Sequence, residues 1–180
     1  MALLPQNKST EHFIAELFWR DFSRYWCLHN GNKVFSEYGV YDRDHYNWQT
    51  DMDIVQRWRL GMTGMPLIDA CMRELNHSGF MSNRGRQIVA CYLALDLHQD
   101  WRYGAYWFEE KLIDHDVQSN TGGWAGAAGM AGGKVLNFNT LLQSTKFDPE
   151  GTFIKTWIPE LADVPMAYIH TPWSIHESHH

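Results

Sequence analysis

Apolar side chains recur at helical spacing along most of this chain, and glycine or proline interrupts the spacing every few turns. In residues 9–29, aromatic and aliphatic side chains fall about one helical turn apart, and Ser9 or Thr10 can serve as the N-cap. The same spacing returns in four further segments, residues 51–60, 66–77, 82–98 and 101–117. Such helices bury their apolar faces against one another. The sequence therefore predicts an all-α fold.

The segments between these helices differ in composition. Residues 30–50 combine turn-forming glycines with alternating aromatic and polar side chains, which predicts an extended loop. Residues 120–133 hold six glycines and four alanines, a composition that predicts a loop which other groups approach closely. Weaker helical character returns over residues 134–142 and 151–161.

The totals fit one domain spanning residues 1–180, because 44% apolar residues can form a core of ordinary size. Charged residues make up 20% of the chain, and no apolar run approaches the length of a membrane span. We therefore expect a cytoplasmic or nuclear protein with no membrane association and no secretory signal. The formal net charge of −6 argues against a protein that coats nucleic acid non-specifically.

The residue types that ligate metals lie in unsuitable positions. Cys27, Cys71 and Cys91 are far apart in apolar periodic segments, which predicts reduced thiols in the core. Three histidines trail at the C-terminal end, His176, His179 and His180. They lack a cage of cysteine or carboxylate ligands, so no metal site is expected.

Aromatic residues are more frequent than core packing requires, with nine Trp, eight Tyr and nine Phe. Many of them stand beside charged or amide residues rather than in apolar runs. This pattern suits an aromatic ligand or stacked bases. A small aromatic-rich core without a ligand would give the same composition.

One motif joins a carboxylate, an indole and a guanidinium on a single helical face. Glu16, Trp19 and Arg20 are spaced i, i+3 and i+4 in the first predicted helix. An ion pair on the helix surface would explain Glu16 and Arg20. It does not explain why the indole of Trp19 lies on the same helical face.

Polar side chains open the most apolar predicted helix, at Asn83, Arg84, Arg86 and Gln87. Such donors, together with the free backbone N–H groups of a helix start, can bind an anion or a heterocycle. Asp114 and Asp116 point different ways on a helix, so at most one of them meets Arg86. By itself this pair would be a solvated acidic turn.

Together these motifs resemble the photolyase and cryptochrome family in order and spacing. The matching segments are residues 16–22, 58–70, 79–87, 100–104, 112–116 and 146–151. The resemblance runs from about residue 11 to Trp173, and Gln87, where photolyases usually carry Met, favours the DASH cryptochromes. It implies a helical FAD-binding domain truncated at its N-terminus, without the antenna domain and the phosphate-binding loop of the family. No antenna pigment is therefore expected.

The resemblance implies FAD as the cofactor. Five residues match family positions that surround the flavin, namely Asn83, Arg86, Asp114, Asp116 and Asn120. Arg86 and Asp114 are expected to pair beside the ring, and Asn120 to lie near its N5 atom. Without the phosphate-binding loop, Arg20 or a second chain would contact the remainder of FAD.

Three tryptophans, Trp124, Trp101 and Trp48, match the family's chain of indoles that relays an electron from the surface to photoexcited flavin. For any single one of them, core packing is the simpler explanation. Their joint match favours the relay.

The resemblance also implies a nucleic-acid substrate. Trp19 would stack on an extruded pyrimidine dimer and Glu16 would hydrogen-bond to it, while Arg84 and Gln87 would also face the substrate. Gly126 stands where the family usually has a second aromatic wall. Single-stranded DNA, or RNA, is therefore expected to be preferred over a duplex.

Three functions remain in competition. The first is a photolyase, a carbon–carbon lyase that splits cyclobutane pyrimidine dimers with an electron from photoexcited reduced FAD. The second is a flavin blue-light photoreceptor without repair activity, and the third is a helical scaffold that binds no FAD. Glu16 with Trp19 favours repair, whereas the missing phosphate-binding loop favours the scaffold. A homodimer that covers an exposed apolar face is also expected.

Overall fold

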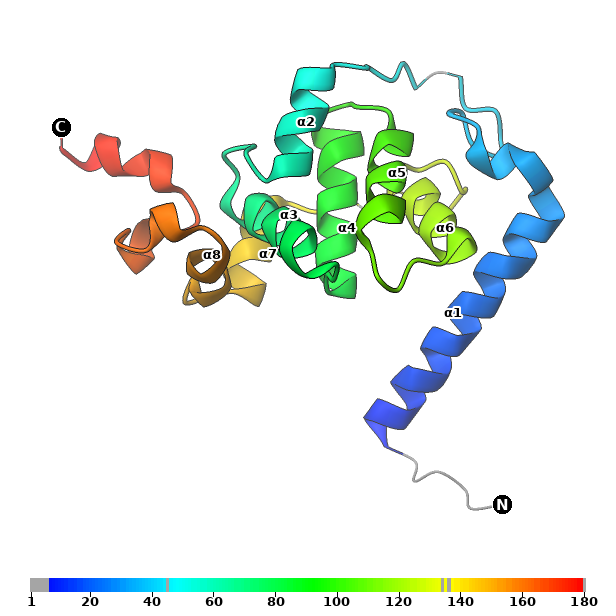
Figure 1. The fold of residues 1–180 in the computed structure, drawn as a ribbon, viewed down its shortest axis with the longest axis horizontal. Coiled ribbons are helices and arrows are strands. Elements are labelled where there is room, and N and C mark those ends of the chain that lie inside the picture. Colours follow the sequence, from blue (N-terminus) through cyan, green and yellow to red (C-terminus); the bar gives the residue numbers. More distant parts are fainter. Residues whose placement is uncertain (1–6, 45, 134, 136, 180) are drawn as a thin grey trace.

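The computed structural model describes residues 7–44, 46–133, 135 and 137–179, and these contain helices but no named strand (Figure 1). The main helices are α1 (Lys8–Asn30), α2 (Met52–Leu60), α3 (Pro66–Ser78), α4 (Asn83–Cys91), α5 (Trp101–Lys111), α6 (Val117–Ala127), α7 (Thr140–Phe147) and α8 (Thr152–Trp157). Shorter helical segments are η1 (Gly31–Phe35), η2 (Tyr92–Asp96), η3 (Pro159–Leu161), η4 (Met166–Tyr168) and η5 (Pro172–His179). The all-α prediction is confirmed. No helix in the described ranges has both the length and the apolar character needed to cross a bilayer.

Helix α4 lies at the centre of the body, between α3 on one side and α5 and α6 on the other (Figure 1). Its residues Ile88 and Val89 are buried and share one core cluster with Trp58 of α2 and Met72 of α3. The broad apolar face predicted for residues 82–98 is therefore buried from several directions.

The prediction of a loop over residues 120–133 is wrong for its first half, which belongs to α6. Asp116 caps this helix, because its carboxylate accepts a hydrogen bond from the backbone N–H of Ser119 at 2.9 Å. Helix α1 packs on α6 at Gly122, where a built Cβ would lie at an ordinary contact distance of 3.5 Å from the Ser23 hydroxyl oxygen. Within residues 120–133, the glycines with positive φ are Gly129, Gly132 and Gly133, which follow the end of α6.

Other predicted boundaries also shift. Helix α5 ends at Lys111 and not near residue 117, because the next residue has an extended backbone. Of the segment 134–142, α7 covers only the last three residues, since Asn139 caps its N-terminus. Residues 134 and 136 lie outside the described part of the chain. The helical character expected over residues 151–161 is confirmed as α8 and η3.

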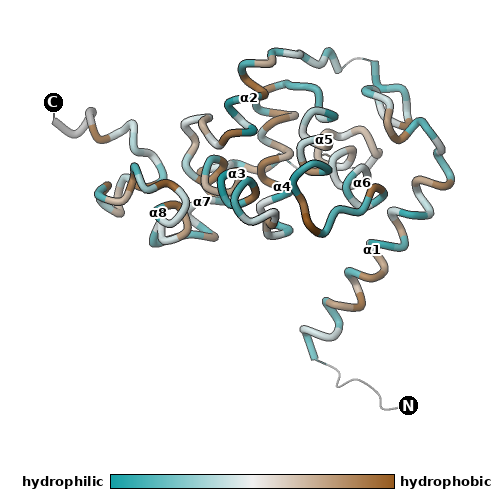
Figure 2. The backbone as a smooth tube through the Cα atoms, viewed as in Figure 1, coloured by the Kyte–Doolittle hydropathy of each residue, from teal (hydrophilic) through white to brown (hydrophobic). Residues whose placement is uncertain are grey.

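Helix α1 projects from the body, and none of its residues is buried (Figures 1 and 2). Asn7, rather than Ser9 or Thr10, is its N-cap, because the Asn7 side chain accepts from the backbone N–H of Thr10 at 2.9 Å. Apart from Thr10, half-buried residues occur only in the second half of the helix. Large apolar side chains that stay exposed on α1 are Phe13, Ile14, Leu17, Phe18, Trp19, Phe22, Tyr25 and Leu28.

Main-chain hydrogen bonds fix the loop predicted over residues 30–50, which begins as η1, against the start of α5. Gln49 and Gln99 form a parallel bridge, in which the N–H of Gln49 donates to the carbonyl of the residue before Gln99 at 2.9 Å. The N–H of Asp100 donates to the carbonyl of Gln49 at 3.0 Å. Gln99 is itself fully buried, and its side-chain oxygen accepts from the N–H of Asp51 at 2.8 Å.

Two of the three cysteines are thiols of the core, as predicted. Cys71 and Cys91 are buried, and burial raises the pKa of Cys71 to about 12 and that of Cys91 to about 11. Cys27 is free but only half-buried in α1. The core thiols are therefore poor nucleophiles.

Candidate functional site

A charge pair joins α4 to the connection between α5 and α6. The Nη2 atom of Arg86 donates to both carboxylate oxygens of Asp114, at 3.0 and 2.9 Å. The Nε–H of Arg86 is held by the carbonyl of Met81 at 2.9 Å, and its guanidinium lies 5.9 Å from the centre of the Phe80 ring. Three contacts thus fix this guanidinium at the start of α4.

Asp116 takes a different partner from Asp114. It caps α6, and its other oxygen lies 4.0 Å from the Nη2 atom of Arg24 on α1. The Ser119 backbone N–H, more than the Arg24 charge, holds the pKa of Asp116 below its usual range. The two carboxylates therefore serve separate donors, as the sequence indicated, and Asp116 ties α1 to α6.

Asn120 lies one turn into α6 and faces α5. Its Nδ2 atom donates to the carbonyl of Ala105 at 3.0 Å. With His115 and Trp101 it lines a cavity of about 40 Å³ between the two helices. The Nε2 atom of His115 is buried there without a hydrogen-bond partner among the described residues. A cavity of this size accepts about one water molecule, not a ring system.

Trp124 of α6 lies in the core and is 2% exposed. It packs edge-on against Trp58, with ring centres 5.8 Å apart, and against Phe108, with ring centres 5.1 Å apart. Its Nε1 atom has no hydrogen-bond partner among the described residues. Helix α5 approaches the indole at Gly104, one turn after Trp101.

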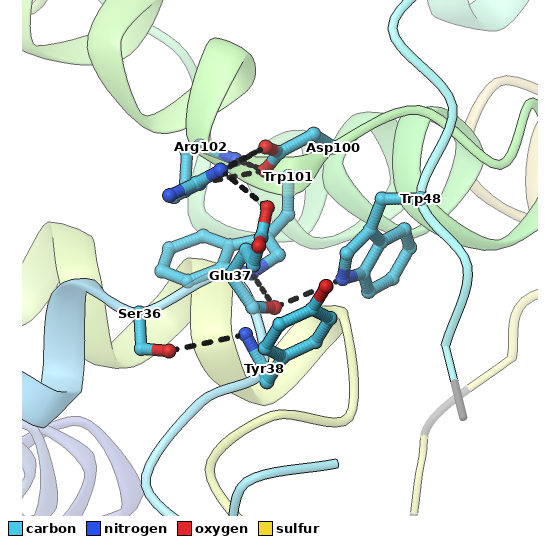
Figure 3. A network of polar contacts seen from close by, with 7 residues as sticks. All are labelled: Ser36, Glu37, Tyr38, Trp48, Asp100, Trp101 and Arg102. Carbon is cyan, nitrogen blue, oxygen red and sulfur yellow. Dashed lines mark hydrogen bonds and ion pairs between the residues drawn. The ribbon is translucent and has the colours of Figure 1, made fainter. Parts of the chain in front are cut away.

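The other two tryptophans of the expected relay meet at one carbonyl group (Figure 3). The Nε1–H groups of Trp48 and Trp101 both donate to the main-chain oxygen of Glu37, at 2.9 and 3.3 Å. Trp101 is 1% exposed, whereas Trp48 is half-buried and stacks on Tyr46 with ring centres 5.3 Å apart. The relay residues thus extend from the core to a partly exposed edge.

The structure does not bring Glu16, Trp19 and Arg20 to the other candidate residues. Among the described residues, the ion pairs and ring contacts of their side chains are all within α1. The ion pair considered between Glu16 and Arg20 is not formed, because Arg20 instead meets the adjacent Asp21 at 3.2 Å. Glu16 lies 3.6 Å from His12. Trp19 is 63% exposed.

The polar residues that open α4 are largely accessible. Asn83 and Arg84 are exposed and Gln87 is half-buried. The Arg84 guanidinium lies over the rings of Phe138 and Phe147, 5.3 and 5.4 Å from their centres. Arg84 therefore joins the start of α4 to the C-terminal part of the chain.

Sequence reasoning missed Glu37 and Trp58. The helical spacing of α2 indicated that Trp58 is buried, but not that its ring touches Trp124. Glu37 acts through its main-chain oxygen, for which a sequence has no signal. The only available hint was the Asp100–Trp101–Arg102 run, whose first residue caps α5.

Residues 13–180 match the family described as the FAD binding domain of DNA photolyase. The chain belongs to the photolyase and cryptochrome family.

Members of this family similar to the chain carry both names. A cryptochrome DASH from Ostreococcus tauri is 53% identical over 93% of this chain and 30% of its own length. The solved Synechocystis cryptochrome has a TM-score of 0.91 at 48% identity, covering 94% of this chain and 35% of its own. The Sulfolobus tokodaii photolyase, solved with two FAD molecules, has a TM-score of 0.86 at 38% identity, covering 92% and 39%. The chain spans about a third of these photolyase-family proteins.

The photolyase-family match identifies FAD as the cofactor of this domain, and the side chains present suit it. The Arg86 guanidinium with its Asp114 partner and the Asn120 amide offer the charge and the mixed donors and acceptors that a flavin ring requires. Trp124 also supplies a buried N–H that has no partner in the described ranges of the chain. We therefore assign these four residues to the flavin side of the site as a proposal, with Asn83 and Asp116 beside them and Arg20 toward the remainder of FAD.

Replacing Asp114 by alanine is expected to weaken FAD binding roughly tenfold or more, because it leaves the Arg86 guanidinium without its carboxylate. Quenching of FAD fluorescence during a protein titration measures the change. Asp163→Ala removes an exposed carboxylate elsewhere and should leave binding unaltered. A parent protein that fails to bind FAD at concentrations of about tens of micromolar would contradict the assignment.

Proposed function

We propose that this chain is a photolyase-type carbon–carbon lyase that repairs cyclobutane pyrimidine dimers, preferably in single-stranded nucleic acid. The observation that carries the proposal is the exposed indole of Trp19, with the Glu16 carboxylate one turn before it on α1. An exposed indole face can stack on a base, and a nearby carboxylate can hydrogen-bond to its edge. The likeness to a Sulfolobus photolyase supports the same activity. The buried Cys71, which forms no disulfide, supports a cytoplasmic location.

Bound reduced FAD, excited by light, would supply the electron that opens the dimer and receive it back. The chain's own residues would hold the two reactants. Trp19 would stack on the extruded dimer, Glu16 would bond to its polar edge, and Arg84 and Gln87 would face the strand. The Asn120 amide would lie near the flavin N5 atom, and it can donate or accept a hydrogen bond as the redox state changes. Two carbon–carbon bonds of the cyclobutane ring would break, the carbon–carbon double bond of each pyrimidine would form again, and no net electron would be consumed.

The preference for single strands is supported by Gly126. A Cβ built on this residue meets no atom within 4 Å, so the space beside α6 is open where a second aromatic wall could stand. Stacking of about 1–3 kcal/mol per base is thereby forgone. The loss is comparable to the few kcal/mol needed to extrude a dimer from a duplex. The net charge of −6 also disfavours a long duplex track. The contacts proposed for Trp19 and Glu16 do not involve the 2′-OH, so they suit RNA as well as DNA.

The test is to illuminate the reduced, FAD-loaded protein with oligonucleotides that contain one dimer, both single-stranded and annealed. Restored pyrimidines are then quantified. We expect repair of the single strand and little repair of the duplex, and we expect Glu16→Ala and Trp19→Ala to lower the repair rate strongly. Tyr25→Ala removes another exposed aromatic ring of α1 and should have little effect.

Equal repair of both substrates would contradict the strand preference alone. Photoreduction without any repair would favour the second candidate, a flavin blue-light photoreceptor. That candidate is supported by the cryptochrome names of similar proteins and by the tryptophan relay, which needs no substrate. Repair that is unaffected by Glu16→Ala and Trp19→Ala would contradict the roles given to these residues.

We further infer that two copies of the chain pair through α1 in antiparallel orientation. Ile14, Phe18 and Tyr25 form an exposed stripe on this helix at helical spacing. Its first half carries the carboxylates Glu11 and Glu16 with Lys8, a net charge of −1, and its second half carries Arg20 and Arg24 with Asp21, a net charge of +1. Antiparallel pairing sets each half against its opposite charge and covers the stripe.

Phe18→Lys is expected to convert this dimer into a monomer, because it places a charge in the middle of the paired stripes. Sedimentation velocity at increasing protein concentration measures the change. Met166→Lys alters an exposed apolar residue outside α1 and should leave the dimer intact. A parent protein that sediments as a monomer at all concentrations would contradict the pairing.

A further inference from the structure

Two indoles of the expected relay share a single hydrogen-bond acceptor (Figure 3). Trp48 and Trp101 both donate to the main-chain oxygen of Glu37, although Glu37 and Trp101 are 64 residues apart in the sequence. A carbonyl oxygen has two lone pairs, so it can accept both N–H groups at once. The orientation of each indole is therefore linked to that of the other.

Three charged side chains, those of Glu37, Asp100 and Arg102, lie beside this carbonyl (Figure 3). We call these three side chains the Glu37 cluster. The Nη2 atom of Arg102 donates to the Glu37 carboxylate at 2.9 Å and to the Asp100 carboxylate at 2.6 Å. Asp100 and Arg102 are the chain neighbours of Trp101, and the Asp100 side chain is only 6% exposed. Two carboxylates against one guanidinium leave one negative charge in excess beside the two indoles.

The surroundings of Trp124 are different. Its ring contacts are Trp58 and Phe108, both apolar, and its N–H has no partner in the described part of the chain. A positive charge on Trp124 would therefore lack the stabilisation that the Glu37 cluster offers to Trp48 and Trp101.

This difference matters when an indole loses an electron. The product is a radical cation, with a positive charge spread over the ring and an acidic N–H. An amide carbonyl accepts a hydrogen bond from that N–H but is too weak a base to remove the proton. The charge therefore remains on the ring, where nearby carboxylates stabilise it. When an electron returns, the neutral indole is restored without any proton transfer.

We propose that Glu37 is a positioning residue of the tryptophan relay, whose carbonyl aligns Trp48 with Trp101 and whose carboxylate holds the positive charge on this pair and away from Trp124. The proposal rests on the proposed function, because it assumes that an excited flavin takes the electron in the loaded protein. The property it assigns to Trp48 and Trp101 is nevertheless present in the protein without FAD.

The test uses Glu37→Gln, which keeps the main-chain carbonyl and an oxygen that Arg102 can reach but removes the excess negative charge. In the FAD-free protein, a ruthenium(III) tris-bipyridine oxidant generated by a laser flash removes electrons from accessible tryptophans. The part of the oxidation rate that is due to Trp48 is the difference between the rate of each protein and the rate of its Trp48→Phe variant. We expect Glu37→Gln to lower this Trp48 oxidation rate roughly threefold to tenfold. Glu37→Asp, which restores the charge, should recover most of the rate.

Two controls separate this effect from a merely structural one. Glu110→Gln removes one negative charge at the far end of α5, where Glu110 pairs with Lys111, and should leave the rate unaltered. The indole N–H signals of Trp48 and Trp101 in NMR spectra should keep their positions in Glu37→Gln, because the shared carbonyl is retained. A further readout uses the FAD-loaded protein, in which Glu37→Gln should shorten the lifetime of the tryptophan radical cation after a flash by a similar factor.

Oxidation of Glu37→Gln at the parent rate with unaltered indole signals would overturn the proposal, and so would an equal slowing by Glu110→Gln. Loss of the two indole signals from their parent positions would also overturn it, because the alignment would then depend on the carboxylate. A protein that binds no FAD would refute the proposed function but would leave the oxidant experiment fully informative.

Discussion

Replacing Trp124 by phenylalanine is expected to abolish light-driven reduction of FAD by the relay. Phenylalanine is not oxidised under these conditions, so the residue proposed to stand next to the flavin could no longer give an electron. The variant should still fold, because the Trp124 N–H has no hydrogen-bond partner among the residues that the structure describes. The space left between Trp58 and Phe108 costs roughly 1–3 kcal/mol of stability.

The measurement is the bleaching of oxidised FAD absorbance under blue light with a thiol as external donor. Trp58→Phe is the matched control, because Trp58 is equally buried and touches Trp124 but lies outside the expected relay. If Trp58→Phe stops photoreduction and Trp101→Phe does not, the electron path runs through α2 instead of α5. Photoreduction of Trp124→Phe at the parent rate would remove Trp124 from the path.

Replacing Gly104 by alanine is expected to lower the free energy of unfolding by about 3 kcal/mol, near the upper end of ordinary overpacking. A Cβ on Gly104 would overlap the ring atoms of Trp124. The ring cannot move aside easily, since Trp58 and Phe108 hold its other edges. The better helix propensity of alanine, worth up to about 1 kcal/mol, offsets only part of this cost.

Urea unfolding followed by circular dichroism measures this change. Gly123→Ala is the matched control, because Gly123 is also helical and a Cβ built on it meets no atom within 4 Å. That control should raise stability by roughly 0.5–1 kcal/mol. Equal stability of the Gly104 variant and the parent would show that the indole can shift, and the position of Trp124 would then be less fixed than its contacts indicate.

The sequence predicted helices wherever large apolar residues mark the turns, as in α2, α3 and α4. It failed for α6, because glycine and alanine provide no such periodic signal and their usual association with loops prevailed. The available signal was Asp116, whose side chain caps α6. The N-cap of α1 was likewise placed at Ser9 or Thr10 instead of Asn7, since several capping residues stand in succession.

Only those contacts of the candidate site that are made by side chains were predictable from the sequence. Spacing alone indicated that at most one of two carboxylates meets Arg86, and the family resemblance selected Asp114, which is the partner that the structure shows. The shared acceptor of Trp48 and Trp101 was beyond reach, because a main-chain oxygen is identical at every residue. The roles of Glu16 and Trp19 stay predictions, since the ion pair of Glu16 and the ring contact of Trp19 both lie within α1.

The bridge between Gln49 and Gln99 has a consequence for the order in which the contacts of the fold form. Contacts between successive helices such as α2 with α3 and α3 with α4 close short loops and can form early. The bond from the Asp51 N–H to the Gln99 side chain joins residues 48 positions apart, so its closure costs more chain entropy. We therefore expect refolding to complete the α2–α4 core before Trp48 reaches α5. The Trp48 indole would then be placed beside Trp101 only after this helical core has formed.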